Sequence, residues 1–591
     1  MTEATEPTER REPPEGYYVD NFRAVLDTVA TLDGPLLSGA EVAWRARFGQ
    51  MSRDAQRLYV RLVSRKGPLF RRERLVYPEI ADLDAAAREL ERFELLDRGR
   101  DASLAERLAL LRRPELAALL HEVAGTEGGG SRRAELIARL FEQVPLETLA
   151  AALDRRLEVL RPLGRDHVRV FRLLFFGNLD QDWTELLLAD LGVVRYESYP
   201  LRPDRRLFSS RRAVDATLAA REMRAELRVL LAHDETEAAL ALGRSSLDRL
   251  TGGEVEPLAR PHLDRVVTKV GRLLERLDRP REALEHYRAA EAPPARERSA
   301  RVLEHLGEVE AAFEVVEAME QTPRDEAEVV AARRLRRRLT KARGDEPPPR
   351  RRRRLAHVLE LTPDPDLCVE RRVLAHYEAL GKIGVWSENW LWRALFGLTF
   401  WDIVFAPVQG AFQHPFQVAP LDLDGPGFQA ARGEQIETRL AELRGEDDLR
   451  PRVRATLEAK RGVANPFVAW HSELDAALDL ALGAGDGDAG PLRGRHLALV
   501  AKRLARDPGR YRRGLPDLFL VDSEEPEGFR LLEVKGPGDQ LRPEQTGWLD
   551  HFEDHGFPAS VLKVVWSPVS ASRQDAASAG ADPDRSTIAE S

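Results

Sequence analysis

The stretch FRLLEVKGPGD, Phe529 to Asp539, decides how the C-terminal part of the chain is interpreted. Its first seven residues have the pattern of an apolar strand that ends in Glu533 and Lys535, and the glycines and proline that follow predict a turn. The sequence holds only eight lysines against 82 arginines, so a lysine at this strand end is unusual. An ammonium is a compact point charge whose pKa shifts readily, whereas a guanidinium is a planar fork that stays protonated. We therefore expect Lys535 to have a role that arginine cannot fill.

A second strand pattern, LPDLFLVD, lies upstream and places Asp517 at its beginning. The polar turn DSEEPEG separates the two strands, which predicts an antiparallel hairpin that brings Asp517 near Glu533 and Lys535. Glu533 and Lys535 are two residues apart and therefore share one strand face. Val534 points into the core, and its backbone carbonyl can still turn toward the same site. A helix pattern, RPEQTGWLDHFEDHG, and a third strand pattern, SVLKVVW, follow.

Two carboxylates and a backbone oxygen form a hard, oxygen-rich site that suits Mg²⁺ or Mn²⁺. Such a metal ion would lower the pKa of a bound water and stabilise the charge that develops on a phosphate. Lys535 could orient that water or stabilise the transition state by its charge. A Glu-x-Lys pattern on its own is equally typical of an exposed ion pair at the end of a hairpin, so both interpretations stay open at this point.

The composition is that of a globular protein, with 43% hydrophobic and 32% charged residues. No apolar run approaches the roughly 20 residues that span a bilayer, and the N-terminal residues lack the apolar segment of a secretory signal. The single cysteine, Cys368, excludes an internal disulfide bond. We therefore expect a cytoplasmic protein without a membrane partner. The net charge of −9 argues mildly against nucleic acid as a partner, although twelve basic residues gather between Arg333 and Arg354.

The chain as a whole reads as a mainly α, multidomain protein with an α/β region at its C-terminal end. GPLFRRERLVYPEI resembles the wing of a winged helix, and Leu111 to Gln143 reads as two short helices around a glycine loop. The second pattern resembles a SAP-type module, with an ordinary helical hairpin as the open alternative. DEPPPRRRRR, residues 345–354, predicts a surface loop. The expected segments are a disordered tail at 1–16, a winged-helix-like DNA-binding region at 17–100, a SAP-like helix–loop–helix at 101–145, an α-helical region resembling tetratricopeptide repeats at 146–365, the α/β region at 366–566 and a disordered tail at 567–591.

The strand-end residues, taken together, resemble the PD-(D/E)xK nuclease superfamily. The words RRGLPDLFL and LLEVKGPGDQLRPEQTGWL are similar to its VRR-NUC branch, and more specifically to the Fanconi-associated nuclease family, bacterial members included. NFRAVLDTVATL, DAQRLYVRLVSRKGPLFRRERLVYPEI and FGLTFWDIVFAPVQGAFQHPFQVAPLDL are also similar to that family. The resemblance covers most of residues 17–566 and identifies the region 366–566 as a VRR-NUC nuclease domain with a mixed sheet.

The resemblance implies a metal-dependent, structure-selective DNA nuclease that cuts near 5′ flaps, trims DNA in the 5′-to-3′ direction and acts in the repair of interstrand crosslinks. It assigns catalysis to Asp517, Glu533 and Lys535. It assigns metal binding to Glu388, Asp517, Glu533 and the Val534 carbonyl, with Mg²⁺ or Mn²⁺ as the ion. Glu473 is a rival to Glu388, and packing or surface placement explains the neighbouring His471.

Gln545 is expected near the site, whereas packing explains Trp548 well. Candidate DNA-phosphate contacts are Arg65, Lys66, Arg71, Arg72, Arg512 and Arg513. The resemblance also implies a pocket of basic residues for a 5′ phosphate in the helical middle, without placing it. Two alternatives stay open: a Holliday-junction or restriction-type endonuclease, and a non-catalytic DNA-binding scaffold. The sequence does not distinguish a monomer from a dimer.

Overall fold

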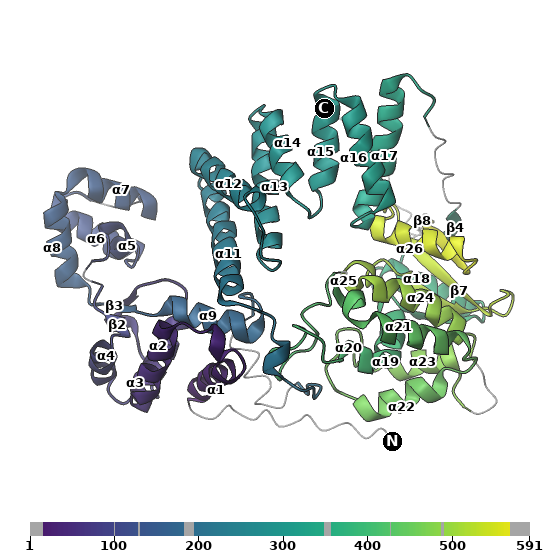
Figure 1. Cartoon of the computed structure of the whole chain (residues 1–591), viewed down its shortest axis with the longest axis horizontal. Coiled ribbons are helices and arrows are strands. Elements are labelled where there is room, and N and C mark those ends of the chain that lie inside the picture. Colours follow the sequence, from purple (N-terminus) through teal and green to yellow (C-terminus); the bar gives the residue numbers. More distant parts are fainter. Residues whose placement is uncertain are drawn as a thin grey trace, which may run out of the picture. The chain divides into compact units, whose positions relative to one another are not determined.

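The computed structural model describes residues 16–99, 101–127, 130–181, 194–347, 356–425, 427–485 and 490–567 (Figure 1). Nearly all of the two expected tails, and most of the expected loop at 345–354, lie outside these ranges. By compactness the chain divides into two units. Unit 1 comprises Met1–Ala295, Val404–Asp422 and Gly462–Asn465, and unit 2 comprises Arg296–Ile403, Leu423–Arg461 and Pro466–Ser591. Among the described residues, no helix has both the length and the apolar character that crossing a membrane requires.

The N-terminal part of unit 1 is a group of helices packed around Trp44, which is fully buried. Ser38 caps the helix α2 (Gly39–Gln50): its hydroxyl accepts the Glu41 N–H, and the Glu41 carboxylate accepts the Ser38 N–H. These elements are α1 (Tyr17–Leu32), η1 (Gly34–Leu36), α2 (Gly39–Gln50), α3 (Arg53–Val63), β1 (Phe70–Arg71), η2 (Arg72–Arg74), α4 (Leu83–Arg92) and β2 (Leu96–Asp97).

The segment expected to form a β wing is largely irregular. It contributes only β1, after which the chain turns into the short 3₁₀ helix η2. Both β1 and β2 pair with a strand that the sequence patterns did not predict, β3 (Val159–Pro162), in the order β1-β3-β2. Ion pairs from Arg71 and Arg74 to Glu115 draw this segment toward the following helices instead of extending it.

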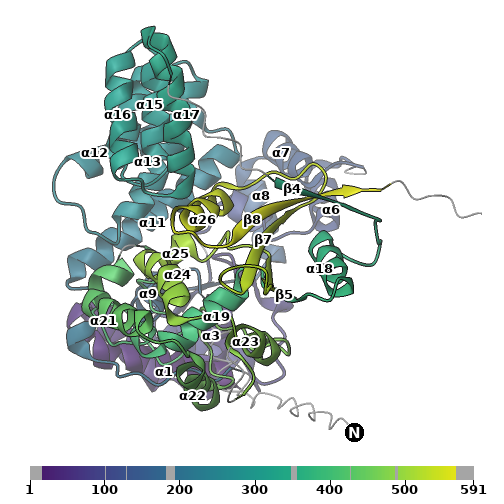
Figure 2. The ribbon, with the colours of Figure 1, turned by 90° about the vertical axis from the view of Figure 1, so that its right-hand side faces the viewer.

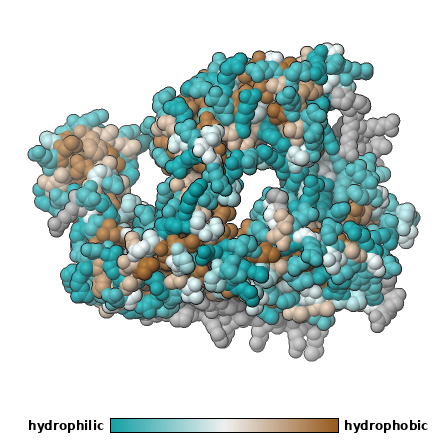
Figure 3. Space-filling view, viewed as in Figure 1, coloured by the Kyte–Doolittle hydropathy of each residue, from teal (hydrophilic) through white to brown (hydrophobic). Residues whose placement is uncertain are grey.

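The two helices predicted around the glycine loop are confirmed as α6 (Arg113–Ala124) and α7 (Arg133–Gln143). Together with α5 (Leu104–Leu108) and α8 (Leu146–Arg156) they enclose a separate apolar core. Hydrophobic residues gather on the visible face of this module, at the left of Figure 3. Its exposed apolar side chains include Phe141 and Leu146, which are 39% and 58% exposed. The SAP-like identity remains a prediction.

The helical middle consists of paired helices, as the sequence patterns predict. Close approach of α12 and α13 leaves no room for a Cβ atom at Gly243, which would lie 2.5 Å from the Val270 side chain. The helices are α9 (Arg165–Phe176), α11 (Arg211–Ala232), α12 (Thr236–Thr251), α13 (Arg260–Arg276), α14 (Pro280–Ala289), α15 (Ala295–His305), α16 (Val309–Gln321) and α17 (Glu326–Arg343), with the 3₁₀ helix η3 (Pro203–Arg205). Unit 2 begins at Arg296, so it contains α16, α17 and all of α15 after Ala295.

Unit 2 is built on a mixed five-stranded sheet in the order β4-β8-β7-β6-β5 (Figure 2). The strand β8 runs parallel to both β4 and β7, whereas β6 runs antiparallel to β7 and β5. The strands are β4 (Ala356–Leu361), β5 (Ile383–Trp386), β6 (Leu518–Val521), β7 (Phe529–Lys535) and β8 (Ala559–Trp566). The helices are α18 (Val369–Ala379), α19 (Trp390–Thr399), α20 (Trp401–Val404), α21 (Gly427–Arg444), α22 (Arg450–Lys460), α23 (Leu474–Leu482), α24 (Gly494–Arg506), α25 (Pro508–Tyr511) and α26 (Pro543–Asp554).

Alternation along the strands gives the sheet two different faces. Leu518, Leu532 and Val534 pack with Val373 and Leu374 of α18. The intervening residues of β6 and β7 face the other side, where Phe519 and Phe529 stack and Phe529 also meets the ring of Phe557, the residue after α26 and its turn. Glu533 and Lys535 belong to this second face because the side-chain period of a strand is two residues.

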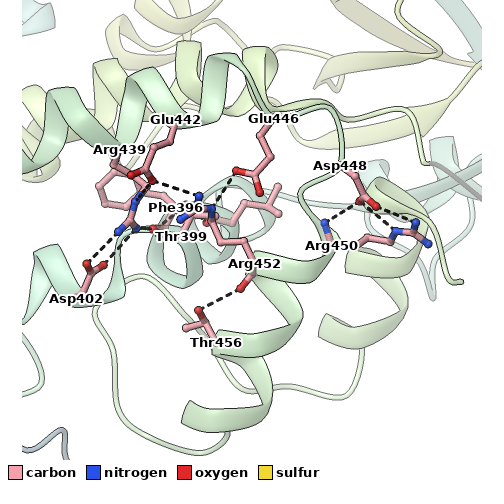
Figure 4. Close-up of polar contacts among 11 residues, drawn as sticks. Phe396, Thr399, Asp402, Arg439, Glu442, Glu446, Asp448, Arg450, Arg452 and Thr456 are labelled. Atoms are coloured by element: carbon pink, nitrogen blue, oxygen red, sulfur yellow. Dashed lines mark hydrogen bonds and ion pairs between the residues drawn. The ribbon is translucent and has the colours of Figure 1, made fainter. Parts of the chain in front are cut away.

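A network of ion pairs holds the far end of α19 (Figure 4). Arg439 of α21 donates to the Thr399 carbonyl and pairs with Asp402 and Glu442. Arg452 of α22 pairs with Glu442 at 3.2 Å and with Glu446 at 3.0 Å. The bonds satisfy a helix C-terminal carbonyl with a cation, which is favourable at that end of a helix dipole. They fix α19, whose first residues border the strand ends.

Candidate active site

The hairpin of β6 and β7 brings Asp517 and Glu533 together. Leu518 pairs with Leu532, so Asp517, the residue before β6, lies opposite Glu533 on the same face. The backbone N–H of Val534 donates to the Asp517 carboxylate at 2.8 Å, which fixes the direction of that side chain. Asp517 is 8% exposed and Glu533 is fully buried. The antiparallel pairing that the sequence predicts is confirmed, and it places two carboxylates side by side in the interior.

Two donors hold one oxygen of Glu533. The Lys535 ammonium donates to Glu533 Oε1 at 2.5 Å, and so does the Gln545 side-chain amide, also at 2.5 Å. The Gln545 carbonyl oxygen accepts the Arg542 N–H at the start of α26, so its NH₂ group is the end that faces Glu533. Glu533 Oε2 is buried without a hydrogen-bond partner in the described part of the chain. The protein thus holds one oxygen of Glu533 by two donors and leaves the other as a free acceptor within the described chain.

Burial governs the acid–base behaviour of this pair. Burial raises the pKa of Asp517 to about 6, against the lowering effect of the Val534 N–H and the Lys535 charge. Burial and the neighbouring Asp517 charge raise the pKa of Glu533 to about 8. Two buried carboxylates side by side are costly to ionise together, and a cation between them would remove this cost.

The donor set fits a divalent metal ion. Hard cations bind carboxylate and carbonyl oxygens, and the unpartnered Glu533 Oε2 is an acceptor of this kind. Within the described residues, no three His, Cys, Asp or Glu side chains are already grouped as a metal cage. The two protein carboxylates at the hairpin therefore form the centre of the candidate site, to which other oxygen ligands must be added.

Glu388 is the second residue after β5, and its backbone lies beside that of Asp517. The N–H groups of Ser387 and Glu388 donate to the Asp517 carbonyl at 2.8 and 3.0 Å. Asn389 has a positive φ of 66° and accepts the Leu515 N–H at 2.9 Å, which turns the chain from β5 into α19. The Glu388 side chain itself is exposed. The structure therefore brings the backbone of Glu388 to Asp517 and leaves its side chain exposed.

The rival Glu473 lies at the start of α23, where it is exposed and pairs with Arg371 at 2.9 Å. The neighbouring His471 packs edge-on against the Trp390 ring, with 4.4 Å between ring centroids. Trp548 is buried in α26 and donates its indole N–H to the Tyr511 carbonyl at 3.0 Å, as expected of a packing residue.

Sequence analysis did not identify Glu370 as a neighbour of the site. It lies in the first turn of α18, whose Val369 is close to Gly536 at the end of β7, and its charge contributes to raising the pKa of Asp517. The Glu370 carboxylate is 147 positions before Asp517 in the sequence (517 − 370), so spacing gave no signal for it.

The predicted DNA contacts fall into two groups. Arg71 is turned inward, with its side chain 10% exposed and paired with Glu73 and Glu115, and Arg72 pairs with Asp84 at 2.5 Å. Arg65 and Lys66 are exposed, and Arg65 donates to the Tyr77 hydroxyl at 3.1 Å. Arg512 pairs with Asp424 at 3.2 Å, and Arg513 is exposed. The last two precede Asp517 on the loop that leads into β6.

A basic cluster in unit 1 also escaped sequence analysis. Arg221 and Arg224 of α11 and Arg265 of α13 surround the buried His262, whose Nδ1 is 3.4 Å from Arg224 Nη1. Burial and the three arginine charges lower the pKa of His262 to about 4. Arg221 and Arg224 are three residues apart and share one face of α11, and His262 and Arg265 share one face of α13 in the same way. This spacing is visible in the sequence. The two helices had to be packed together before it became a cluster.

Two family models match the chain. The one described as "FAN1, HTH domain" matches residues 16–97, and the one described as "VRR-NUC domain" matches residues 444–566. The chain is 33% identical over 566 residues to the "Fanconi-associated nuclease 1 homolog" of Pseudomonas aeruginosa, covering 94% of this chain and 96% of that protein. It is 28% identical to the rice homolog and 26% identical to human Fanconi-associated nuclease 1, and it spans 64% and 62% of their lengths.

Solved structures agree with the sequence comparisons. A crystal structure of paFAN1 bound to DNA with a two-nucleotide 5′ flap and a gap superposes with a TM-score of 0.80 at 31% identity. The superposed region covers 95% of this chain and all of the paFAN1 chain. The same protein with a one-nucleotide flap gives a TM-score of 0.78 at 32% identity.

Proposed function

Because the chain belongs to the Fanconi-associated nuclease family, we propose that Asp517, Glu533 and Lys535 are the residues with which it hydrolyses DNA. A VRR-NUC nuclease domain of the PD-(D/E)xK type occupies its C-terminal part, and such nucleases generally need a divalent metal ion. One observation carries the residue assignment. Two buried carboxylates face each other at a hairpin end, and the Glu533 oxygen that Lys535 and Gln545 leave free has no partner within the described chain.

Asp517, Glu533 and the Val534 carbonyl would hold the metal, with Glu388 as a further ligand, and we propose Mg²⁺ or Mn²⁺. The ion, when bound, lowers the pKa of a water and neutralises charge on the phosphate. Gln545 donates to one oxygen of Glu533 and so leaves the other oxygen available to the ion, and the Lys535 ammonium would stabilise the charge that builds on the phosphate oxygens. The water oxygen forms the new bond to phosphorus and gives up a proton to solvent, the P–O bond to the leaving nucleotide breaks, and the leaving oxygen takes up a proton from solvent.

The proposed substrate is branched DNA with a 5′ flap, by relation to the paFAN1 complexes. The cluster of Arg221, Arg224 and Arg265 supports binding of a terminal 5′ phosphate, because guanidinium groups bind phosphate oxygens; Arg221 also pairs with Asp180 at 3.6 Å. The proposal extends to 5′-to-3′ trimming, to the repair of interstrand crosslinks, and to action on chromosomal DNA in a bacterial cytoplasm.

The test is cleavage of labelled flap, Holliday-junction and linear duplex DNA by the full chain in Mg²⁺ or Mn²⁺. We expect cutting near the flap junction. Asp517→Ala and Lys535→Ala should each lower the cleavage rate by about 10²-fold or more and leave flap affinity unchanged. Glu388→Gln should lose cleavage, whereas the matched Glu473→Gln should keep it. An Asp517→Ala enzyme that cuts at the wild-type rate would overturn the site assignment.

A further inference from the structure

Arginines in unit 2 are commonly neutralised by a nearby carboxylate, as Arg439 is by Asp402 in Figure 4 and Arg503 is by Glu326. Arg393 and Arg513 depart from this pattern. Neither has an ion-pair partner among the residues that the structure describes. Arg513 is exposed, but Arg393 is half-buried, and a half-buried cation without a counter-charge is costly. A ligand that supplies negative charge next to Arg393 would offset this cost.

Arg393 is held in place by neutral groups. It lies in α19, its Nη2 donates to the Pro466 carbonyl at 2.7 Å, and its Nε is buried without a partner in the described chain. Burial lowers the pKa of Arg393, and the nearby charges of Arg512 and Arg513 lower it further. Among the described residues, Arg512 is the one of these three arginines that pairs with a carboxylate, that of the exposed Asp424. The three cations therefore form a locally unbalanced positive cluster.

The cluster borders the candidate active site. Arg393 lies one turn beyond Asn389, whose side chain accepts the Leu515 N–H. Arg512 and Arg513 lie on the loop that contains Leu515 and leads into Asp517. The backbone before Asn389 meets the Asp517 carbonyl through the Ser387 and Glu388 N–H groups. The two elements that carry the arginines are thus the same two that converge at Asp517.

We propose that Arg393, Arg512 and Arg513 together bind one backbone phosphate of the strand that is cut, next to the bond placed at Asp517. The inference rests on the proposed function and adds Arg393 as a positioning residue for the DNA strand. Guanidinium groups suit this role because their planar forks match phosphate oxygens and stay charged. A phosphate held there would set which bond reaches the carboxylates.

The experiment measures binding of the full chain to 5′-flap DNA without divalent metal, so that no cutting occurs. The cut strand carries a single neutral methylphosphonate, moved one linkage at a time across the junction. For the wild type we expect one linkage near the cutting position at which affinity falls about tenfold or more. Arg393→Gln and Arg513→Gln should each bind unmodified flap about tenfold more weakly and lose the sensitivity to that linkage. Their plots of log affinity against log salt should be shallower by roughly 0.7 to 0.9.

Arg495→Gln is the matched control, since it removes the same charge from an exposed arginine that pairs with Glu527, and it should keep the wild-type profile. If Arg393 only ties α19 to Pro466, Arg393→Gln will lower the Tm but keep the sensitivity to the methylphosphonate. That result, or unchanged profiles in both Arg393→Gln and the exposed Arg513→Gln, would overturn the inference. A wild-type chain that binds with this profile but fails to cut in Mg²⁺ or Mn²⁺ would instead overturn the proposed function.

Discussion

At the scale of single residues, the candidate site is defined by a conflict between Asp517 and Glu533. Both carboxylates are buried, and burial raises the pKa of each. The Asp517 charge raises the pKa of Glu533 further, and among the described residues Lys535 is the cation in contact with Glu533. Such an arrangement is unfavourable for folding alone and favourable for binding a cation. This cost is consistent with a functional site, because proteins often keep residues there that are unfavourable for folding.

Metal affinity should depend on pH because the ion binds the ionised carboxylates. The pKa values of Asp517 and Glu533 are raised to about 6 and about 8, so protons must leave as the ion enters. We expect the affinity for Ca²⁺, measured calorimetrically on the full chain, to rise between pH 6 and pH 8, with proton release in buffers of different ionisation enthalpy. Glu533→Gln should bind weakly at every pH. A wild-type affinity that stays constant over this range would contradict the pairing.

The same pKa shifts act on stability with the opposite sign. In the metal-free chain the folded carboxylates keep protons that the unfolded ones have lost above their ordinary pKa values of 3.8 and 4.5. The contribution of these two groups to the free energy of unfolding therefore falls as the pH rises toward 8. Bound Ca²⁺ should reverse this contribution.

Residue identities at the site could be predicted where they depend on local pattern. The spacing of Glu533 and Lys535 and the strand start at Asp517 are visible in the sequence, and the hairpin register that joins them follows from the turn. Arg393 and Glu370 could not be found this way. Their relation to Asp517 exists only after α18 and α19 pack at the strand ends, which no local pattern specifies.

At the scale of elements, α26 is positioned by the loop before Asp517. Gly514 has a φ of +83°, and a Cβ atom there would lie 2.5 Å from the Glu544 carbonyl carbon and 2.7 Å from the Gln545 nitrogen. The absence of a side chain at Gly514 lets the loop touch the first turn of α26, and Gln545 of that turn reaches Glu533. Loop, helix and carboxylate therefore form one connected support.

Gly514→Ala should displace the start of α26, because the collision is with backbone that has no room to rotate away. We expect a lower Tm and a cleavage rate reduced about tenfold or more, since supporting contacts of a metal site are commonly worth that much. Gly538→Ala is the matched control, with a φ of +89° but no atom within 4 Å of the added Cβ. It should cost only the backbone strain, about 1–2 kcal/mol, and keep most activity. Equal loss of activity in both variants would contradict the account.

The long, periodic elements could be predicted from the sequence and the short edge strands could not. The strand β7 was expected at Phe529–Lys535 and is found there. The strand β4 escaped prediction because its residues are mostly exposed, with Val358 at 67%, and lack an alternating pattern. The strand β3 escaped because it is four residues long between helices and forms only by pairing with β1 and β2.

At the scale of the whole molecule, sequence order and compact units do not coincide. Val404–Asp422 belongs to unit 1, although unit 2 contains the chain on both sides of it. In that segment His414 is fully buried and stacks on Phe175, with 4.6 Å between ring centroids. The Tyr199 hydroxyl donates to the His414 carbonyl and accepts the Gln417 N–H. The core of unit 1 is therefore completed by a segment that is more than a hundred residues downstream.

A chain cut at Ala295 should be destabilised by the loss of this segment, because Tyr199 and Phe175 would lose buried partners. We expect the isolated residues 1–295 to melt at a lower temperature than the full chain, as measured by circular dichroism. A synthetic peptide of residues 404–422 should raise the melting temperature of this fragment. A scrambled peptide of the same composition is the control. A fragment whose melting the native peptide does not change would show that the segment is not part of the core of unit 1.

The most direct measurement of the central claim is an anomalous diffraction map of the full chain crystallised with Mn²⁺. We expect a peak between the carboxylates, with Asp517 and Glu533 oxygens about 2.1 Å away. The Glu533 oxygen facing it should be the one that Lys535 and Gln545 leave free. A peak bound elsewhere, or none beside these two side chains at a Mn²⁺ concentration that supports cleavage, would contradict it.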